Sequence, residues 1–531
     1  MTTVGRRETM AGLVGAALVQ HTAGAQTAAP KRGGILRMAV NTIPASGSIH
    51  EEMAVATVQP FMPVYNNLVM FDQQKKVNTQ DGIVPDLALD WSWSEGNTRI
   101  TFKLARGVTW HDGKPLTSAD VKYTWDTLRK LRNNGWRRTP RRQQFANLEE
   151  VTTSGTDTVS FKLARPQPSF MTLLATGFSP VYPEHVDGSV MRRQPIGTGP
   201  FKVTGFTTEG VKLVRNPNYW KSGRPYLDGI EWTVMSNAAT LALAFVAGKL
   251  DVADLALPQM ADVKAQAPNA KYSVDTSNSH YHVFLNRKRP PFDDDRIRRA
   301  FNLTLDRQEF LKVIGGGYGR IGGAMLPPPD GVWGLTPEDL AAIPGYGGDI
   351  DANRAIARKL MQEAGYGPDN PVKVQIVTRN ISTFVSTSVL VMDHMRKIWI
   401  ESDMKIVETP QWDIVQAGAD WSMLLGAYGA AADDPDVVLS DGFDCKSASN
   451  FTDYCVADIQ AKIDAQSAML DPVARARIVR EIDRALMMDT ARPVLLHNAH
   501  CTCQHPYVRG FVTAANGVYN NWRLEDVWLD T

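Results

Sequence analysis

Residues 290–303 read Pro-Pro-Phe-Asp-Asp-Asp-Arg-Ile-Arg-Arg-Ala-Phe-Asn-Leu. A segment rich in proline and aspartate comes first, and a run of helical periodicity follows it. Four apolar residues of that run share one helical face, namely Ile297, Ala300, Phe301 and Leu303. The stretch therefore predicts an amphipathic helix that packs against a core on one side and meets water on the other.

Outward from this helix, strands and helices alternate along the chain. Period-two patterns predict strands at 33–40, 99–105, 158–164, 211–215 and 230–235. Helical periodicity and capping residues predict helices at 117–128, 238–246, 352–364, 384–400 and 471–489. Such interleaving favours an α/β fold built from packed layers.

The composition is that of a soluble globular protein with a neutral charge balance. The chain has 531 residues, of which 43% are hydrophobic and 21% charged. Lys and Arg together number 57 and Asp and Glu number 56, so the net charge is +1. This balance gives no reason to expect a nucleic acid or an anionic membrane as partner.

The first 25 residues have the pattern of a secretion signal. Arg6-Arg7 precede an uncharged apolar stretch, Ala11 to Val19, and Ala23-Gly24-Ala25 follows as a small-residue cleavage site. The paired arginines fit the twin-arginine route, and an ordinary Sec signal fits the same pattern. The apolar run is too short to span a bilayer, so we expect an exported protein without membrane insertion.

The chain has four cysteines. Cys445 and Cys455 enclose a short polar loop, and export to an oxidising compartment favours a disulfide between them. Cys501 and Cys503 are two residues apart, so on a strand their side chains point the same way and do not converge.

Four stretches in a fixed order resemble extracellular solute-binding family 5, whose members bind peptides, nickel complexes, glutathione and other solutes for ABC importers. They are Val84–Ala88 through Trp110-His111-Asp112-Gly113 to Ala119-Asp120-Val121, then Ile196–Phe201 with Arg215–Trp220, then Pro291–Ala300, and last Asp434-Pro435-Asp436. The resemblance covers nearly the whole mature chain. Most of these motifs are turns and tight connections, and none is a ligand site by itself.

The resemblance implies an α/β, two-lobed periplasmic-binding-protein fold (type II, cluster C-like) with an extended first lobe. Lobe I would comprise 33–285 and 503–531, and lobe II 286–502. The chain would cross near Leu285-Asn286 and return near Cys503-His505. The ligand would bind in the cleft between the lobes and shift the hinge equilibrium toward the closed state.

The implied function is that of a periplasmic, monomeric, non-enzymatic carrier without a cofactor. It would bind a small polar solute, peptide-like or acidic, and deliver it to an inner-membrane ABC permease. Two alternatives stay open, a metal-chelate or nickel-type carrier and an exported hydrolase on the same scaffold. The sequence contains no G-x-S-x-G, no H-E-x-x-H and no phosphate loop to support the hydrolase.

The resemblance also carries residue roles from the dipeptide-binding branch. There an aspartate holds the free amine of the peptide, and the matching residue here is Ala431. Asp433 could take that role if the register slips by two. Without a carboxylate, a buried ammonium is costly, so we expect a ligand that needs no amine.

The same branch holds the peptide carboxylate with an arginine, and Arg379 matches it. Arginine forms bidentate bonds to carboxylate or phosphate. Tyr428 and Trp412 are candidates for aromatic walls. By family position the loop from Ile43 to Ser48, including Ser46, should face the cleft from the first lobe.

A cluster of His and Cys residues carries the metal hypothesis. On a strand, four of its residues share a face, namely His497, Cys501, Cys503 and His505. Imidazole and thiolate are ligands for zinc, copper and nickel. We interpret the segment mainly as a structural crossing strand and keep these four as metal candidates.

Overall fold

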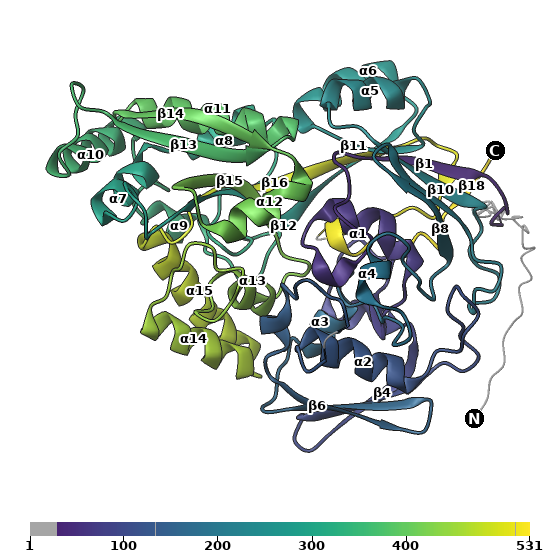
Figure 1. The fold of residues 1–531 in the computed structure, drawn as a ribbon. Helices are drawn as coiled ribbons and strands as arrows, with labels where there is room; N and C mark the ends of the chain where they lie inside the picture. Colours follow the sequence, from purple (N-terminus) through teal and green to yellow (C-terminus); the bar gives the residue numbers. More distant parts are fainter. Residues whose placement is uncertain (1–28, 133, 516) are drawn as a thin grey trace, which may run out of the picture.

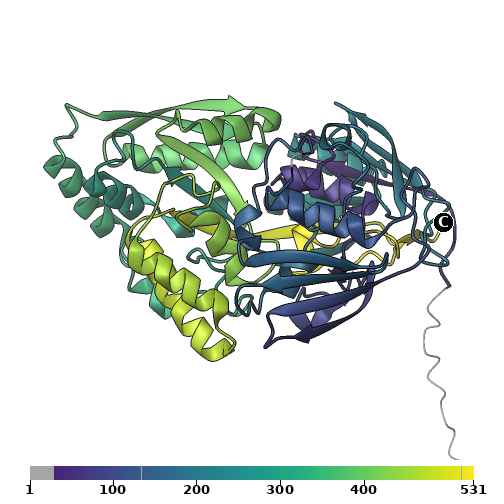
Figure 2. The same ribbon diagram turned by 60° about the horizontal axis from the view of Figure 1, so that its bottom comes forward.

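The computed structural model describes residues 29–132, 134–515 and 517–531, so the predicted signal at 1–25 lies outside the described residues. Two lobes lie side by side and are joined by long strands (Figures 1 and 2). In Figure 1 the purple to teal segments and the yellow C-terminal segment form one lobe, and the green segments form the other. No helix of the described residues has the length and apolarity that crossing a membrane requires.

The first lobe contains two four-stranded sheets. One has the order β1 (Ile35–Val40), β10 (Gly229–Val234), β9 (Gly210–Arg215), β8 (Phe201–Thr207). The other has the order β4 (Ala88–Ser94), β5 (Arg99–Leu104), β7 (Thr158–Leu163), β6 (Leu148–Ser154). The string Phe-Lys-Leu-Ala-Arg occurs twice, at 102–106 and 161–165, where β5 and β7 end. These two strands pair antiparallel, with Phe102 opposite Val159. Two short pairs complete the set, β2 (Val69–Phe71) with β3 (Ile83–Pro85) and β17 (Val508–Arg509) with β18 (Trp528–Leu529).

A six-stranded mixed sheet connects the lobes. Its order is β11 (Val252–Leu255), β16 (Val494–Gln504), β12 (Lys271–Leu285), β15 (Met423–Gly429), β13 (Val372–Arg379), β14 (Ile400–Val407). The last part of β16 pairs with β11 of the first lobe on one side and with the first part of β12 on the other, whereas the end of β12 pairs with β15 of the second lobe. The pairing of β12 with β16 is irregular between Thr276 and His280. Both crossing strands therefore belong to both lobes.

Helices cover the sheets of each lobe (Figure 1). In the first lobe they are α1 (Val55–Phe61), α2 (Ser118–Leu128), α3 (Phe170–Ala175), α4 (Gly188–Met191), α5 (Ala238–Val246) and α6 (Met260–Gln266). In the second they are α7 (Asp295–Thr304), α8 (Arg307–Val313), α9 (Pro337–Ala341), α10 (Ile350–Glu363), α11 (Ser382–Arg396), α12 (Thr409–Gly418), α13 (Pro435–Gly442), α14 (Ala457–Ala468) and α15 (Pro472–Met488). Short 3₁₀ turns are η1 (Ile49–Glu51), η2 (Met62–Val64), η3 (Gln80–Gly82), η4 (Arg142–Phe145), η5 (Leu257–Gln259) and η6 (Gly517–Tyr519).

The helix that the opening stretch predicts is α7, and its start is capped as the sequence suggests. The Asp294 side chain accepts a hydrogen bond from the Arg296 amide. The helix predicted at 384–400 is too long, because α11 ends at Arg396. Trp399 has a left-handed φ of 64°, and Ile400 already begins β14, so the chain turns from helix to strand there.

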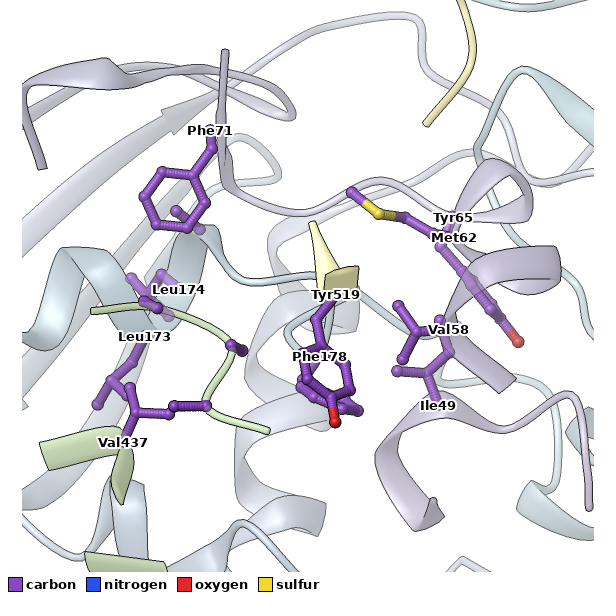
Figure 3. Packing of buried hydrophobic residues seen from close by; sticks show 14 of the residues in the cluster. Ile49, Val58, Met62, Tyr65, Phe71, Leu173, Leu174, Phe178, Val437 and Tyr519 are labelled. Atoms are coloured by element: carbon purple, nitrogen blue, oxygen red, sulfur yellow. The ribbon is translucent and has the colours of Figure 1, made fainter. Parts of the chain in front are cut away.

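One hydrophobic cluster runs through the first lobe and into helices α13 to α15 of the second. Figure 3 shows part of it, with Leu173 and Leu174 of α3 near Val437 of α13 and with Tyr519 beside Phe178. The rings of Phe178 and Tyr519 lie 5.0 Å apart between centroids. A separate cluster fills the sheet and helices at the far end of the second lobe. Apolar burial therefore continues across the junction between the lobes.

Two of the sequence motifs hold the backbone rather than a ligand. A Cβ atom on Gly197 would lie 1.8 Å from the Val64 carbonyl oxygen, so only glycine fits this close approach. Asp434 caps α13 by accepting from the Asp436 amide at 2.9 Å and binds the Arg475 guanidinium through both oxygens at 2.8 and 3.0 Å. The Asp-Pro-Asp motif thus ties α13 to α15.

Candidate functional site

A cavity of about 270 Å³ lies between the lobes, where β15 and the crossing strands pass from one to the other. Residues of the first lobe that line it include Thr42, Gln59, Arg141 and Phe178. Residues of the second lobe include Arg379, Trp412, Tyr428 and Asp441. A second compartment of about 380 Å³ shares Tyr281, Asp254 and His500 with it. This size and mixed lining suit a small solute.

Arg379 stands at the end of β13 on the cavity wall. Its guanidinium lies over the rings of Phe384 and Trp412, at 4.7 and 5.7 Å from their centroids. Among the described residues it has no ion-pair partner, and its Nε has no hydrogen-bond acceptor. Burial lowers the pKa of Arg379 to about 10, which leaves it charged at neutral pH. The group is thus positioned to bind an anion.

The other residues carried over from the dipeptide-binding branch also reach the cavity. Trp412 on α12 and Tyr428 on β15 line it, and the Tyr428 hydroxyl donates to the Val437 carbonyl at 2.7 Å. Ala431 lines the same wall and brings no charge, and its carbonyl accepts a hydrogen bond from the Asn520 side chain. Ala431 therefore contributes a methyl group and no charge to this wall.

Two predicted residues lie elsewhere. Ser46 is buried beside the cavity-lining segment, where its hydroxyl donates to Glu52 at 2.9 Å. Asp433 packs against the loop at Val332 and accepts from that amide at 3.3 Å, and burial raises its pKa to about 7. Neither is among the residues that line the cavity, and their assignment to the ligand stays a prediction. Thr42, just before the predicted loop, faces the cavity instead.

Two buried arginines that the sequence did not single out line the cavity. Arg141 is 4% exposed, donates to the Ile49 carbonyl at 2.6 Å and lies 3.9 Å over the Phe178 ring. Arg492 is 1% exposed and donates to the Gly442 carbonyl at 2.7 Å. Burial lowers the pKa of each to about 10. No sequence motif marks either residue, because they come together only through the fold.

A carboxyl group lies next to these two arginines. Asp441 on α13 accepts from the Gln144 side chain at 2.7 Å, and its Oδ1 has no partner among the described residues. Burial raises the pKa of Asp441 to about 7, against the opposing effect of Arg141 and Arg492. Near neutral pH this group is therefore only partly ionised.

The remaining cavity carboxylates have other partners. Asp413 on α12 forms an ion pair with Arg138 of the first lobe. Asp254 on β11 accepts from the Thr502 hydroxyl at 2.7 Å and from the Gln59 side chain at 3.4 Å. Asp254 also lines the two neighbouring compartments, which none of the three cavity arginines does. The cavity is therefore lined by carboxylates as well as by arginines.

Polar contacts join the lobes across the mouth of the cavity. In addition to the ion pair of Arg138 with Asp413, the hydroxyls of Thr42 and Thr409 lie 2.9 Å apart. Ser382 of the second lobe donates to the Ser236 carbonyl of the first at 3.1 Å. These contacts hold the lobes together in the arrangement that encloses the cavity.

The His and Cys residues of β16 and its end are used locally. His497 contacts the Gly323 carbonyl through Nε2 at 2.9 Å, and His505 stacks on Phe245 with centroids 4.5 Å apart. Cys501 and Cys503 are buried free thiols in a small apolar cluster, and burial raises the pKa of Cys501 to about 12. In the described part of the chain no three His, Cys, Asp or Glu side chains are arranged to hold a metal ion.

The predicted pairing of the other two cysteines is present in the structure. Cys445 and Cys455 form a disulfide with their Cα atoms 5.1 Å apart. The loop that it closes contributes Ser449 and Phe451 to the cavity wall. The bond therefore restrains a segment that faces the ligand space.

Comparisons with known proteins agree with this geometry. The family model of bacterial extracellular solute-binding proteins, family 5 Middle, matches residues 82–450. A probable di/tripeptide-binding protein 5 of Pseudomonas aeruginosa is 25% identical and covers 73% of this chain and 76% of its own length. The structure of the oligopeptide-binding protein AppA from Bacillus subtilis, in complex with a nonapeptide, matches with a TM-score of 0.83 at 20% identity, over 95% of this chain and 100% of that chain. NikZ from Campylobacter jejuni, in complex with Ni(L-His), matches with a TM-score of 0.77 at 18% identity, over 93% and 99%.

Proposed function

Because this chain belongs to the bacterial extracellular solute-binding proteins of family 5, we propose that it captures a small acidic or peptide-like solute between its lobes for an ABC importer. One observation carries the choice of solute. Arg379 presents a charged guanidinium to the cavity with no ion-pair partner among the described residues. An anionic group of the solute supplies the missing counter-charge.

The lobes close on the solute by bending the two crossing strands. We place the boundary of the lobes within β12, at the irregular pairing between Thr276 and His280, rather than at its end near Leu285. Before this point β12 pairs with the part of β16 that lies beside β11, and after it β12 pairs with β15. A solute that contacts both walls binds the closed form better and shifts the equilibrium toward it. The permease then recognises the closed form.

The solute needs no free amine at the position that Ala431 occupies. Arg141 and Arg492 line the same cavity as Ala431 and Tyr428, together with the partly ionised Asp441. An ammonium group placed there would meet two positive charges and no full counter-charge. Peptide-like solutes therefore fit best when their amine is blocked or absent.

The setting of this function follows the family. Residues 1–25 act as the export signal, by the twin-arginine or the Sec route, and the mature chain works outside the cytoplasm as a monomer. It releases the solute unchanged to the permease.

The test is to identify what the protein retains. Native mass spectrometry of the protein purified without denaturation should show one small solute bound at equal stoichiometry and released unchanged on unfolding. Small-angle scattering should show compaction when that solute is added back to the stripped protein. A solute that is converted to product, or binding without any compaction, would contradict the proposal.

A further inference from the structure

Three arginines line the cavity, namely Arg141, Arg379 and Arg492, and the Nε of each has no hydrogen-bond acceptor among the described residues. Resting on the function proposed above, we infer that the solute carries two acidic groups, each a carboxylate or a phosphate. Arg379 binds one of them, and the pair of Arg141 and Arg492 binds the other. The solute class is thus a compact dianion rather than a zwitterionic peptide.

The pair of Arg141 and Arg492 has unused hydrogen-bonding capacity. Each guanidinium donates a hydrogen bond to a backbone carbonyl, at 2.6 Å for Arg141 and 2.7 Å for Arg492. The Nε of each has no acceptor among the described residues. A guanidinium has five N–H donors, so most of them remain available to an anion. Side chains this deeply buried do not gain these bonds from bulk water.

The charge on this side of the cavity is not balanced from within. Asp441 is the carboxyl group beside the pair, and it also accepts a hydrogen bond from the Gln144 side chain. One carboxylate offsets at most one of the two arginines, and burial keeps Asp441 partly protonated near neutral pH. Leaving a buried charge without a partner is strongly unfavourable, and a bound anion removes that cost.

The two anion subsites have different surroundings. Arg379 is held over Phe384 and Trp412, on α11 and α12. Arg492 is held over Tyr428 and Phe443, near α13. Tyr519 lines the same cavity, and both Arg379 and Arg141 act on its hydroxyl. Burial raises the pKa of Tyr519 to about 12, so it stays a neutral hydrogen-bond donor to either acidic group.

The carboxylate of Asp254 offers an alternative mode of binding, in which the solute carries an ammonium group. Asp254 has hydrogen-bond donors but no cation among the described residues, so it could bind an ammonium group. A zwitterionic solute would then use Arg379 and Asp254 and leave Arg141 and Arg492 unpaired. The two readings differ in the number of acidic groups that the solute needs, which can be measured directly.

The experiment titrates the stripped wild-type protein by calorimetry with three matched series of probes. The first contains straight-chain dicarboxylates from malonate to suberate. The second contains the monocarboxylates of the same chain lengths, and the third the corresponding ω-amino acids. At the best length we expect the dicarboxylate to bind about tenfold tighter or more than its monocarboxylate partner, because a second charged hydrogen-bonded pair forms.

Variants assign the second acidic group to its subsite. Arg141→Gln should weaken the best dicarboxylate about tenfold and leave the monocarboxylate unchanged, since the latter uses Arg379 alone. Arg379→Gln should weaken both. Arg142→Gln, an exposed neighbour, is the matched control and should change neither. If Arg141→Gln does not fold, Arg141→Lys replaces it, because lysine keeps the charge but lacks the bidentate guanidinium. The wild-type titrations alone still decide whether the solute needs a second acidic group.

The outcomes separate this inference from the proposed function. If no dicarboxylate binds, or if ω-amino acids bind as tightly and lose affinity in Asp254→Asn, the dianion inference is overturned. Equal weakening of both acids by Arg141→Gln also overturns it, because it means a single anion subsite. Compaction by any of these probes in small-angle scattering would still support solute capture between the lobes.

Discussion

Two groups of buried charges in this protein have opposite designs. In the first lobe, Asp86 is fully enclosed and pairs with Arg523 at 2.7 Å and with Lys221 at 2.9 Å. Lys221 also pairs with Glu525 at 2.9 Å, and Glu525 accepts from the Tyr219 hydroxyl. Every charge in this first-lobe cluster has an opposite charge beside it. In the cavity, Arg379 forms no ion pair among the described residues, and Arg141 and Arg492 share the partly ionised carboxyl of Asp441.

The difference shows what each group is for. The first-lobe cluster joins the C-terminal segment to the Asp86 loop and to the turn at Lys221, so its charges cancel within the fold. Opposite neighbours lower the pKa of Asp86 and raise the pKa of Arg523 despite their burial. In the cavity, burial prevails and lowers the pKa of each arginine to about 10. The paired charges of the first lobe stabilise the fold, whereas we propose that the incompletely compensated charges of the cavity bind the ligand.

The largest expected effect comes from breaking the compensated cluster. Arg523→Met leaves Asp86 with a single cation in a buried site, which should lower the free energy of unfolding by about 3–5 kcal/mol. Urea denaturation followed by circular dichroism measures it. Arg509→Met, which removes an exposed partner of Asp530, is the control and should cost less than about 1 kcal/mol. A loss of less than about 1 kcal/mol in Arg523→Met would mean that this cluster of charges does not stabilise the fold.

The second prediction uses the partial ionisation of Asp441. A bound dianion favours the protonated carboxyl, so the complex holds more protons than the free protein around the pKa of about 7. Dicarboxylate affinity should therefore be constant below that pH and fall as pH rises through it, by about tenfold per unit of pKa coupling. Calorimetric titration across this range measures the profile.

Asp441→Asn should abolish that pH dependence and keep the higher affinity. The groups that face Asp441 are Arg141, Arg492, Tyr428 and Gln144, and none of the four titrates near neutral pH. A profile that is unchanged in Asp441→Asn would assign the titration to another group and remove this carboxyl from the binding site.

The sequence predicted the fold well where local signals were strong. Asp471 and Pro472 marked the start of α15, and the Asp471 side chain accepts from two amides of the first turn. The solute-binding family and the two-lobed architecture followed from motifs that set turns and caps. The end of α11 was missed because the apolar pattern continues into β14, where only the left-handed Trp399 marks the change.

The site was predicted in part, for a physical reason. Arg379, Trp412, Tyr428 and Ala431 lie on the cavity because they follow strands and motifs whose positions the family fixes. Arg141, Arg492 and Tyr519 come from three distant parts of the chain, and only tertiary packing brings them together. Asp433, two residues beyond Ala431, contacts the loop at Val332 and Trp333, and its role toward the ligand stays a prediction.

The third prediction concerns the contacts that close the mouth of the cavity. Asp413→Asn removes the ion pair with Arg138 across the lobes, while Arg138 keeps Glu52 at 2.8 Å. The closed form should lose at most about 1 kcal/mol, so the apparent affinity should fall no more than about fivefold. Small-angle scattering of the unliganded protein should show a larger radius of gyration.

A matched control separates closure from general electrostatics. Asp393→Asn removes an exposed carboxylate of the same lobe that pairs with Arg396 and Lys397. It should change neither the affinity nor the scattering curve. If Asp413→Asn and Asp393→Asn increase the radius of gyration equally, the ion pair of Arg138 with Asp413 does not stabilise the closed form.

The smallest expected effect is the most direct contrast with the first-lobe cluster. Without solute, Arg379→Gln removes a buried charge that has no partner among the described residues, so the free energy of unfolding should stay within about 0.5 kcal/mol of the wild type or rise. Urea denaturation of stripped protein measures it, with Arg396→Gln as an exposed control. With saturating dicarboxylate the wild type should become the more stable of the two, because only the wild type binds the ligand tightly enough for binding to stabilise the folded state. A large loss of stability in the stripped Arg379→Gln protein would mean that this arginine is a structural charge like Arg523, and that the distinction between the two groups is wrong.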